Sequence, residues 1–359
     1  MRAAVFVAAG EPLVVEDLDD PPLGPTHVRV KVEASGVCHT DLSVQSGAIP
    51  YPPPVILGHE SAGTVIEVGP AVRAVRAGDR VVGSFTPTCH RCWHCRRGET
   101  HLCKDLRGMA IAHGLRADGT PVLGMAGLGS FAERITTSED FLVPVRSDLA
   151  SEELALIGCG ASTGLGAVLR TAEVQAGESV AVIGCGGVGL FSVMGAVLAG
   201  AVQVIAADLD AAKLQAASRL GATDLVDATE GNVVEQVRAL TGGRGADHVI
   251  EVVGTPAVIK DALAATRRGG TTVLVGAPAA GSTVLLDATE LQQGARRIIG
   301  CTYGSARVRS DFQRWADLAG AGRLDLPGMI SHRFTLDTIN DALGQLARGE
   351  VVRGVVIMQ

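Results

Sequence analysis

The pattern of hydrophobic and polar positions changes near residue 150. Before that point, short runs of strand-forming residues are separated by turn signals such as Pro21-Pro22 and the segment 77–79. This spacing predicts a β-rich, barrel-like domain. After it, short apolar segments alternate with helical ones, which predicts βαβ units and a parallel sheet. The strands expected in the first part lie at 3–7, 28–34, 63–68 and 80–83.

Six strands are expected in the second part, as in the two mononucleotide-binding halves of a doubly wound sheet. A helical segment at 310–318 and a last strand at 353–358 are expected to return to the first domain. The six strands lie at 180–183, 202–206, 225–226, 248–252, 272–275 and 298–301.

One stretch, 179–207, carries no formal charge and is long enough for a transmembrane helix. Its β-branched run, cluster of glycines and Ala/Val/Leu run are better explained by a strand, a turn and a buried helix. The first ten residues also lack the features of an export signal. We therefore expect a soluble, cytoplasmic protein with no membrane partner.

Composition narrows the function classes further. The 359 residues suggest about two domains. They include 31 Lys and Arg against 38 Asp and Glu, a net charge of −7, whereas a nucleic-acid surface needs a basic footprint. Aromatic residues make up only 3% of the chain, too few to favour a platform for base stacking. No nucleic-acid partner is expected.

Four of the eight cysteines form a C-x2-C-x2-C-x7-C cluster: Cys89, Cys92, Cys95 and Cys103. In a chain without an export signal, such a cluster indicates metal binding or catalysis more often than disulfides. Four thiolates can surround a tetrahedral Zn²⁺ and leave no open position, so the expected site is structural. An iron–sulfur cluster, a redox pair and inert thiols are the alternatives.

A glycine-rich turn follows the strand expected at 180–183 and opens a helical run. The next strand ends at Asp208, 19 residues beyond the last glycine. Together these features predict a dinucleotide site, with the pyrophosphate at the helix N-terminus and Asp208 on the adenosine ribose. The charge of Asp208 favours NAD over NADP. The alternative is a turn that binds nothing. The motif consists of Gly184, Cys185, Gly186, Gly187, Val188 and Gly189.

Three dispersed residues suggest a second metal site. Cys38 follows an apolar strand, His59 lies between turn signals, and Cys159 stands where the two domains would meet. Two thiolates and one imidazole form a known catalytic zinc arrangement with the fourth position open. Each residue alone is more often a core or surface residue than a ligand, and spacing alone does not prove that the three converge.

With these motifs in place, the sequence resembles the zinc-dependent alcohol dehydrogenases of the medium-chain dehydrogenase/reductase superfamily over nearly its whole length. The resemblance implies an α/β protein with a GroES-like catalytic domain at 1–153 and 302–359 and a Rossmann NAD-binding domain at 154–301. It also implies NAD, two Zn²⁺ per chain and, from the loop through 118–120, a homodimer. The matching segments are 36–41, 58–60, 89–103, 158–160, 184–189 with Asp208, and 353–355.

The resemblance assigns Cys38, His59 and Cys159 to the catalytic zinc. Asp41 matches an acid that fixes the tautomer of His59, and Glu60 matches one that can approach the metal during ligand exchange. Thr40 matches the hydroxyl that hydrogen-bonds the substrate alcohol. The coenzyme contacts implied are His39 and Arg353 for the pyrophosphate and Lys213 for the adenosine ribose, with solvated surface charges as the alternative.

Two positions depart from the family pattern. Ser43 stands where many relatives have a histidine that ends a proton relay, so we expect Thr40, the ribose and Ser43 or water to pass the proton. Ile49 stands where the glutathione-dependent formaldehyde branch has an acid, which disfavours glutathione adducts.

The expected reaction is reversible hydride transfer between NAD and a primary aliphatic, allylic or aromatic alcohol or its aldehyde. Two alternatives are a zinc-free quinone or enone reductase on the same fold and a non-enzymatic protein that binds zinc and nucleotide.

Overall fold

Strands in the first part of the chain follow its alternating hydrophobic pattern in the computed structural model, which describes residues 1–105 and 109–358. Strand β3 (His27–Val37) shows this clearly, because Val28, Val30 and Val32 are buried and the residues between them are more exposed. These valines pack in a core cluster with residues of other strands, including Ile135 and Leu142.

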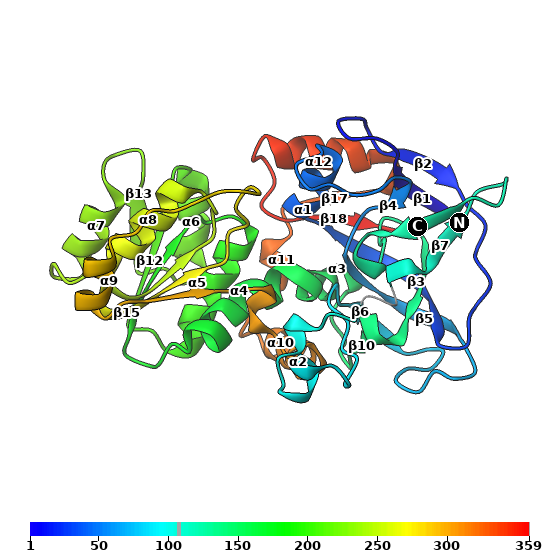
Figure 1. Cartoon of the computed structure of the whole chain (residues 1–359), viewed down its shortest axis with the longest axis horizontal. Helices are drawn as coiled ribbons and strands as arrows, with labels where there is room; N and C mark the ends of the chain where they lie inside the picture. The colour runs from blue at the N-terminus through cyan, green and yellow to red at the C-terminus, as the bar shows by residue number, and fades with distance from the viewer. Residues whose placement is uncertain (106–108, 359) are drawn as a thin grey trace. The chain divides into compact units, whose positions relative to one another are not determined.

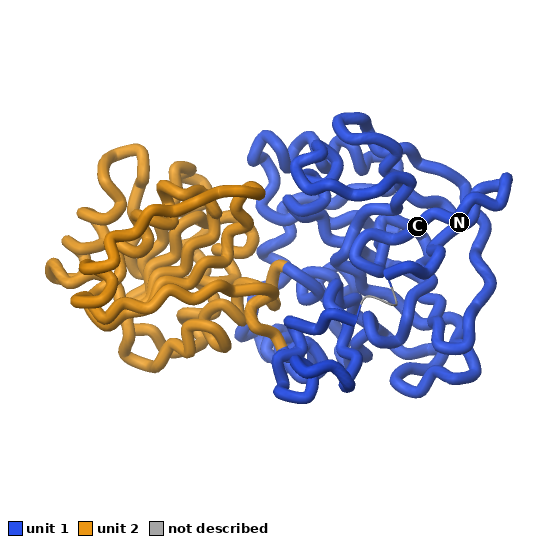
Figure 2. The backbone as a smooth tube through the Cα atoms, viewed as in Figure 1, with its two compact units in different colours: residues 1–159, 307–359 blue, residues 160–306 orange. Residues whose placement is uncertain are grey.

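The chain divides into two compact units, Met1–Cys159 with Arg307–Gln359 and Gly160–Ala306 (Figure 2). The sequence placed these boundaries a few residues earlier, at 153/154 and 301/302. At the first boundary a continuous helical run, Ser151–Ala172, carries the chain across without a turn. The sequence pattern therefore offers no turn residue that marks the change of unit.

Two sheets build the first unit. One is five-stranded in the order β2-β1-β4-β8-β7; the other is seven-stranded in the order β10-β6-β5-β3-β18-β17, with β9 also paired to β3. The remaining strands are β1 (Arg2–Phe6), β2 (Val14–Asp17), β4 (Val55–Ile56), β5 (Glu60–Val68), β6 (Arg80–Gly83), β7 (Ala112–Leu115), β8 (Pro121–Gly124), β9 (Arg134–Ser138), β10 (Leu142–Pro144), β17 (His332–Phe334) and β18 (Gly354–Ile357). The helices are α1 (His39–Gln45), α2 (Trp93–Arg96), α3 (Ser151–Leu156), α10 (Val308–Gly320), α11 (Leu326–Met329) and α12 (Ile339–Ala347).

The antiparallel ladder between β3 and β5 positions the metal-binding residues of this unit. Gly36 of β3 pairs with Glu60 of β5, so Cys38, which follows β3, and His59, which precedes β5, lie at the same end of the ladder. On the other side of β3, β18 pairs in antiparallel register from Gly354, opposite Val37. The residues that flank this end of the ladder therefore come from three strands, of which β18 is far from the other two in sequence.

The second unit contains one parallel sheet of six strands in the order β13-β12-β11-β14-β15-β16. Helix α5 contacts both α4 and α6, and α7 contacts α8, so these five helices form two groups (Figure 1). The strands are β11 (Ser179–Ile183), β12 (Gln203–Asp208), β13 (Asp224–Asp227), β14 (Ala246–Glu251), β15 (Thr266–Leu274) and β16 (Arg297–Gly300). The helices are α4 (Ser162–Gly166), α5 (Gly187–Ala199), α6 (Ala211–Arg219), α7 (Val233–Leu240), α8 (Pro256–Ala265) and α9 (Ala288–Gly294).

This strand order is that of the doubly wound dinucleotide-binding sheet, so the expected fold class is confirmed. The uncharged stretch 179–207 forms β11, the glycine turn, α5 and most of β12, as expected. Among the described residues one helical run, Ser151–Ala172, is long and apolar enough to cross a membrane. However, 72% of its most apolar window is buried inside the protein, which is typical of a core helix.

Candidate active site and metal centres

Cys38, His59 and Cys159 converge in the first unit although they lie far apart in sequence. Their ligand atoms and a carboxylate oxygen of Glu60 all lie within 4.8 Å of one another. Cys38 is the N-cap of α1, immediately after β3, and Cys159 lies in the helical run beyond α3. Two sulfurs and one imidazole nitrogen form a borderline-soft donor set that suits zinc, so the chemistry of the three residues fits the metal.

Asp41 organises this group from within the first turn of α1. The carboxylate is fully buried and accepts hydrogen bonds from the backbone N–H groups of Cys38, at 2.9 Å, and Gly58, at 3.1 Å. His59 Nδ1 lies 3.1 Å from Asp41 Oδ1, so this carboxylate can accept its proton. With the Nδ1 proton held by Asp41, Nε2 is the nitrogen left to bind a metal.

Glu60 forms a buried ion pair with Arg353, which lies just before β18. Glu60 is fully buried and Arg353 is 4% exposed. Burial raises the pKa of Glu60, while the guanidinium of Arg353 opposes that rise. Glu60 Oε1 and Arg353 Nε are buried and have no hydrogen-bond partner among the described residues. Each of the two side chains therefore keeps one polar atom unsatisfied beside the metal-binding group.

The other residues expected at this site also lie on or near α1. Thr40 Oγ1 is 3.7 Å from Cys38 Sγ, His39 is exposed at the first position of the helix, and Ser43 lies half-buried one turn on. The ring of Phe85 meets the His59 ring edge to face, with centroids 5.8 Å apart. The structure thus brings Thr40, Asp41 and Glu60 to the metal-binding residues in a single unit.

The electrostatics of this cluster favour a thiolate. A hydrogen bond from the Cys159 thiol, together with nearby His59, holds the pKa of Cys38 well below its usual range despite burial. The same hydrogen bond and burial raise the pKa of Cys159. Burial lowers the pKa of His59, but the charges of Asp41 and Cys38 outweigh it and leave that pKa well above its ordinary value. A dication at this position would meet at least one sulfur already ionised.

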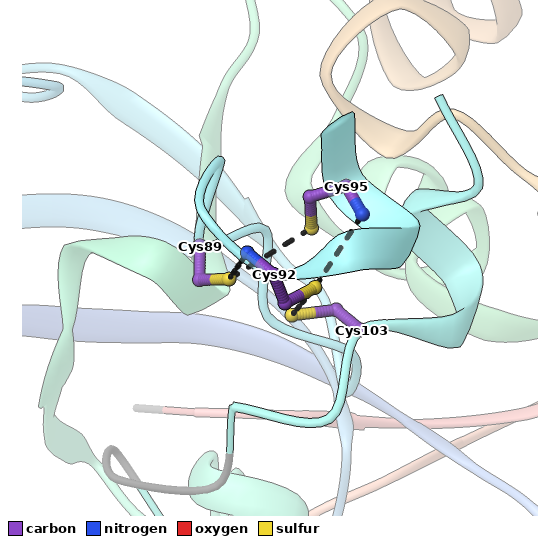
Figure 3. Close-up of side chains that lie close together, drawn as sticks. All are labelled: Cys89, Cys92, Cys95 and Cys103. Atoms are coloured by element: carbon purple, nitrogen blue, oxygen red, sulfur yellow. Dashed lines mark hydrogen bonds between the residues drawn. The ribbon is translucent and has the colours of Figure 1, made fainter. Parts of the chain in front are cut away.

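The second cysteine group lies around helix α2, and its four sulfurs point toward a common centre (Figure 3). The Sγ atoms of Cys89 and Cys95 are 3.9 Å apart, as are those of Cys92 and Cys103. Four sulfurs at the corners of a tetrahedron, each about 2.3 Å from zinc, would be separated by about 3.8 Å. All eight cysteines are free thiols, so no disulfide competes for these sulfurs.

Backbone hydrogen bonds prepare this loop for thiolates. The N–H groups of Cys92 and Cys95 donate to the sulfurs of Cys89 and Cys92, each at 3.4 Å. The Cys95 N–H lowers the pKa of Cys92 to about 6, whereas burial and the neighbouring sulfurs raise the pKa of Cys95 to about 12. The arrangement fits a closed, structural Cys₄ zinc site.

The glycine turn joins β11 to α5 in the second unit. Gly184 has φ = +97°, and a Cβ built on Gly189 would lie 1.8 Å from the Gly184 carbonyl oxygen. Only glycine allows the helix to begin so close to the strand. A Cβ built on Gly186 meets open space within 4 Å, so the backbone there is accessible to a ligand. Gly187 and Val188 form the first turn of α5.

Asp208 ends β12 beside this turn, and backbone donors fix its carboxylate. Oδ2 accepts from the Cys185 N–H at 2.6 Å, and Oδ1 accepts from the Asp210 N–H at 3.0 Å. Lys213 lies in the first turn of α6, with Nζ 3.9 Å from a carboxylate oxygen of Asp210. Lys213 does not line the cavity described next, whereas Asp208 does.

A cavity of 460 Å³ opens beside Asp208. Most of its walls were not predictable from local sequence, because they combine the ends of β11 and β12 with the loop before α7 and one face of α8. Exposed apolar residues directly after strands were the available signal. Leu209 and Val253 are such residues. The other wall residues that the sequence did not indicate are Asn232, Val233, Val258 and Asp261.

These geometries define a class of protein with a β-rich unit that carries two metal-binding groups and a doubly wound unit that carries a dinucleotide turn. Two family models match the chain, the alcohol dehydrogenase GroES-like domain over residues 24–147 and the zinc-binding dehydrogenase domain over residues 187–320. The chain is 37% identical to an alcohol dehydrogenase class-3 of Cereibacter sphaeroides, over 99% of both chains. It is 36% identical to an S-(hydroxymethyl)glutathione dehydrogenase of Synechocystis, again over 99% of both.

Solved structures agree. A benzyl alcohol dehydrogenase of Acinetobacter calcoaceticus is 29% identical with a TM-score of 0.93, covering 100% of this chain and 99% of the other. A zinc-binding dehydrogenase of Sinorhizobium meliloti bound to NADP is 31% identical with a TM-score of 0.84, covering 99% and 98%.

The chain therefore belongs to the zinc-dependent alcohol dehydrogenase family of the medium-chain dehydrogenases/reductases. It is an oxidoreductase with zinc and a nicotinamide nucleotide as cofactors, as the sequence predicted.

Proposed function

We propose that this protein catalyses the reversible, NAD-dependent oxidation of a primary alcohol to its aldehyde, with Cys38, His59 and Cys159 as ligands of the catalytic zinc. The observation that carries the proposal is the convergence of these three side chains, with Asp41 holding the Nδ1 side of His59. Their open fourth position distinguishes this group from the closed Cys₄ group.

When bound, zinc supplies Lewis acidity that lowers the pKa of an alcohol, and NAD supplies the hydride acceptor. The chain's own residues orient and exchange protons around these groups. Asp41 keeps His59 in the tautomer that presents Nε2. Glu60, paired with Arg353, places a second carboxylate within reach of the ligand atoms for metal exchange.

Thr40 is the residue that receives the alcohol proton in this proposal. Its hydroxyl lies beside Cys38, within 3.7 Å of the sulfur, and so close to the position of a substrate oxygen. Ser43 follows on the same helix, less than one turn further along. With the coenzyme bound, its ribose hydroxyl would lie between Thr40 and Ser43 or water. Ser43 or water would take up the proton, because a serine hydroxyl can hand on a proton without titrating near neutrality.

NAD rather than NADP is the proposed coenzyme. The fixed carboxylate of Asp208 can accept hydrogen bonds from both adenosine ribose hydroxyls and would repel a 2′-phosphate. The accessible backbone at Gly186 and the N-terminus of the 13-residue helix α5 suit the pyrophosphate, to which His39 and Arg353 would add charge. Leu209 and Val253 give the neighbouring cavity apolar walls for the adenine.

The test is Cys159→Ala, compared with Cys301→Ser, which alters a buried cysteine outside both metal-binding groups. Cys159→Ala should lose one of two zinc ions and nearly all alcohol oxidation, followed by the absorbance of NADH, while still binding the coenzyme. Cys301→Ser should keep both zinc ions. A Cys159→Ala protein that lacks one zinc ion and retains full activity would refute the proposal.

Oxidation of S-(hydroxymethyl)glutathione is the second candidate, because relatives such as the Synechocystis protein carry that name. The uncharged side chain of Ile49, 39% exposed, gives an anionic glutathione adduct no polar contact at that position. Comparing kcat/KM for this adduct and for benzyl alcohol decides between them. We expect the simple alcohol to be preferred, and a strong preference for the adduct would favour the second candidate.

A zinc-free quinone or enone reductase is disfavoured because both metal-binding groups are complete. A non-enzymatic role is disfavoured by the dehydrogenase names of the relatives. The homodimer and the cytoplasmic location expected from the sequence are part of this proposal. Light scattering should give twice the mass of one chain, and fractionation of the source cells should place the protein in the cytoplasm.

A further inference from the structure

The cavity beside Asp208 contains a second acidic residue, for which the proposed ribose contact gives no role. Among the described residues, its lining includes the acidic residues Asp208 and Asp261 and no lysine, arginine or histidine. Asp208 lies at the carboxyl end of β12, and Asp261 lies on α8, one turn after Val258 on the same helix face. The two acids therefore approach one cavity from two different elements of the second unit.

The two carboxylates differ in what they already bind. Both oxygens of Asp208 accept backbone hydrogen bonds, from Cys185 and Asp210. Asp261 is only half-buried, and its carboxylate has no hydrogen bond or ion pair with any residue in 1–105 and 109–358. A carboxylate ion accepts hydrogen bonds and donates none, so Asp261 is available to a ligand group that donates.

The walls between the two acids fit a flat, largely apolar ring. Leu209 is 69% exposed and Val253 is 45% exposed, although both line the cavity. They follow the carboxyl ends of β12 and β14, the edge where open parallel sheets bind their ligands. Adenine offers two faces for such walls and one exocyclic amino group that donates hydrogen bonds.

We propose that Asp261 accepts a hydrogen bond from the exocyclic amino group of the coenzyme adenine and so selects adenine over a base with a carbonyl at that position. This inference rests on the proposed NAD site and adds a specificity residue to it. A 6-carbonyl group would place two acceptors against each other, whereas the 6-amino group satisfies Asp261. In this proposal Asp208 accepts hydrogen bonds from the ribose, and Asp261 accepts one from the base.

The experiment compares NADH with reduced nicotinamide hypoxanthine dinucleotide, which differs in having oxygen in place of that amino group. Dissociation constants are measured by fluorescence titration of the intact protein. The wild type should bind NADH about tenfold more tightly, the effect of one hydrogen bond to a charged group. Asp261→Ala should remove this preference, and Asp261→Asn should reduce it by binding the hypoxanthine compound more tightly, because an amide can donate to the carbonyl.

Glu235→Gln is the matched control, since this exposed carboxylate on α7 does not line the cavity. It should change both affinities equally and leave their ratio as in the wild type. A wild type without the preference, a preference that survives in both Asp261 variants, or an equal change of the ratio in Glu235→Gln would overturn the role of Asp261. A wild type that binds neither dinucleotide would contradict the proposed function itself.

Discussion

Asp41 and His59 face each other in the first unit with 3.1 Å between Oδ1 and Nδ1, and both side chains are almost completely buried. The same carboxylate also accepts the backbone N–H groups of Cys38 and Gly58. Asp41 therefore contacts the ring of His59, the backbone N–H of the neighbouring Gly58, and the backbone N–H of Cys38, a second proposed zinc ligand.

Asp41→Asn should weaken catalytic zinc binding roughly 10–100-fold, the usual effect of losing a partner of a metal-binding histidine. Competition with a chelator measures this affinity, and NADH binding should not change because the coenzyme turn lies in the other unit. Asp118→Asn, at an exposed turn of the same unit where the carboxylate contacts only its own turn, is the control. Equal zinc affinity in wild type and Asp41→Asn would contradict the role of Asp41.

Cys92→Ser should remove the structural zinc and destabilise the first unit, because binding of a structural metal contributes folding free energy. Elemental analysis should fall from about two zinc ions per chain to about one, with a lower melting temperature. Cys185→Ser changes a buried cysteine outside both metal groups and should retain both ions. A stable Cys92→Ser protein with two zinc ions would show that this site is not as we describe it.

Asp208→Ala should weaken NAD binding and relax the rejection of NADP. The hydrogen bonds to the ribose hydroxyls involve a charged acceptor, which suggests a loss of roughly 1.5–3 kcal/mol for NAD. Dissociation constants for NADH and NADPH in the wild type and the variant provide the measurement. The assignment fails if the wild type already turns over NADPH faster than NADH.

Asp247 should make the stability of the protein depend on pH. Although burial opposes it, hydrogen bonds from Ser179 and Arg267 lower the pKa of Asp247 to about 2. Because the folded pKa lies below the unfolded value of 3.8, the stabilisation is present above the unfolded pKa and is lost as pH falls through the folded one. With 23% of the side chain exposed, screening leaves about 1 kcal/mol at neutral pH.

Urea unfolding of the wild type and Asp247→Asn at neutral pH and near about pH 3 tests this. The difference in unfolding free energy should shrink to about half at the lower pH, because Asp247 is then mostly protonated in the unfolded protein but still mostly ionised in the folded one. A difference that is constant between the two conditions would exclude the linkage.

Ser43→His should add an ionisation near neutrality to alcohol oxidation and raise the rate only modestly. An imidazole titrates near about pH 6.5, whereas the serine hydroxyl does not, and water can replace a terminal relay group. Single-turnover oxidation against pH for both proteins gives the profiles. The expectation is wrong if the wild type already shows a histidine-like ionisation that survives substitution of His39.

The features predicted correctly from the sequence are those that one local pattern determines. The strand, the glycines and the acid at Asp208 are all local, and the six strands of a parallel sheet were expected from the βαβ rhythm, whereas their order comes from the structure. The short helix α1 was not expected, because seven residues between two turns carry little periodicity. Strand β15 begins at Thr266, six residues before its expected start. The earlier part was missed because Arg267, Arg268 and the two glycines that follow are typical of a loop.

The sequence pattern could not show which residues distant in the chain lie close together in the fold. Nothing in the spacing of Cys38, His59 and Cys159 shows that they meet; the resemblance supplied that expectation and the ladder of β3 and β5 explains it for the first two. Asp261 carried no signal, since a helical acid is usually a solvated surface residue. Only the cavity places it beside Asp208.

The pairing of Gly36 with Glu60 implies that folding precedes metal binding at one site, whereas metal binding precedes folding at the other. Sheet formation brings Cys38 and His59 together, so we expect these two ligands to be in place before zinc binds. Cys89, Cys92, Cys95 and Cys103 come from a segment whose helices have only three or four residues, so there the ion itself must draw the chain into shape. Removal of zinc with a chelator should therefore leave the site of Cys38 and His59 able to bind zinc again. The segment that holds the four clustered cysteines should lose its structure.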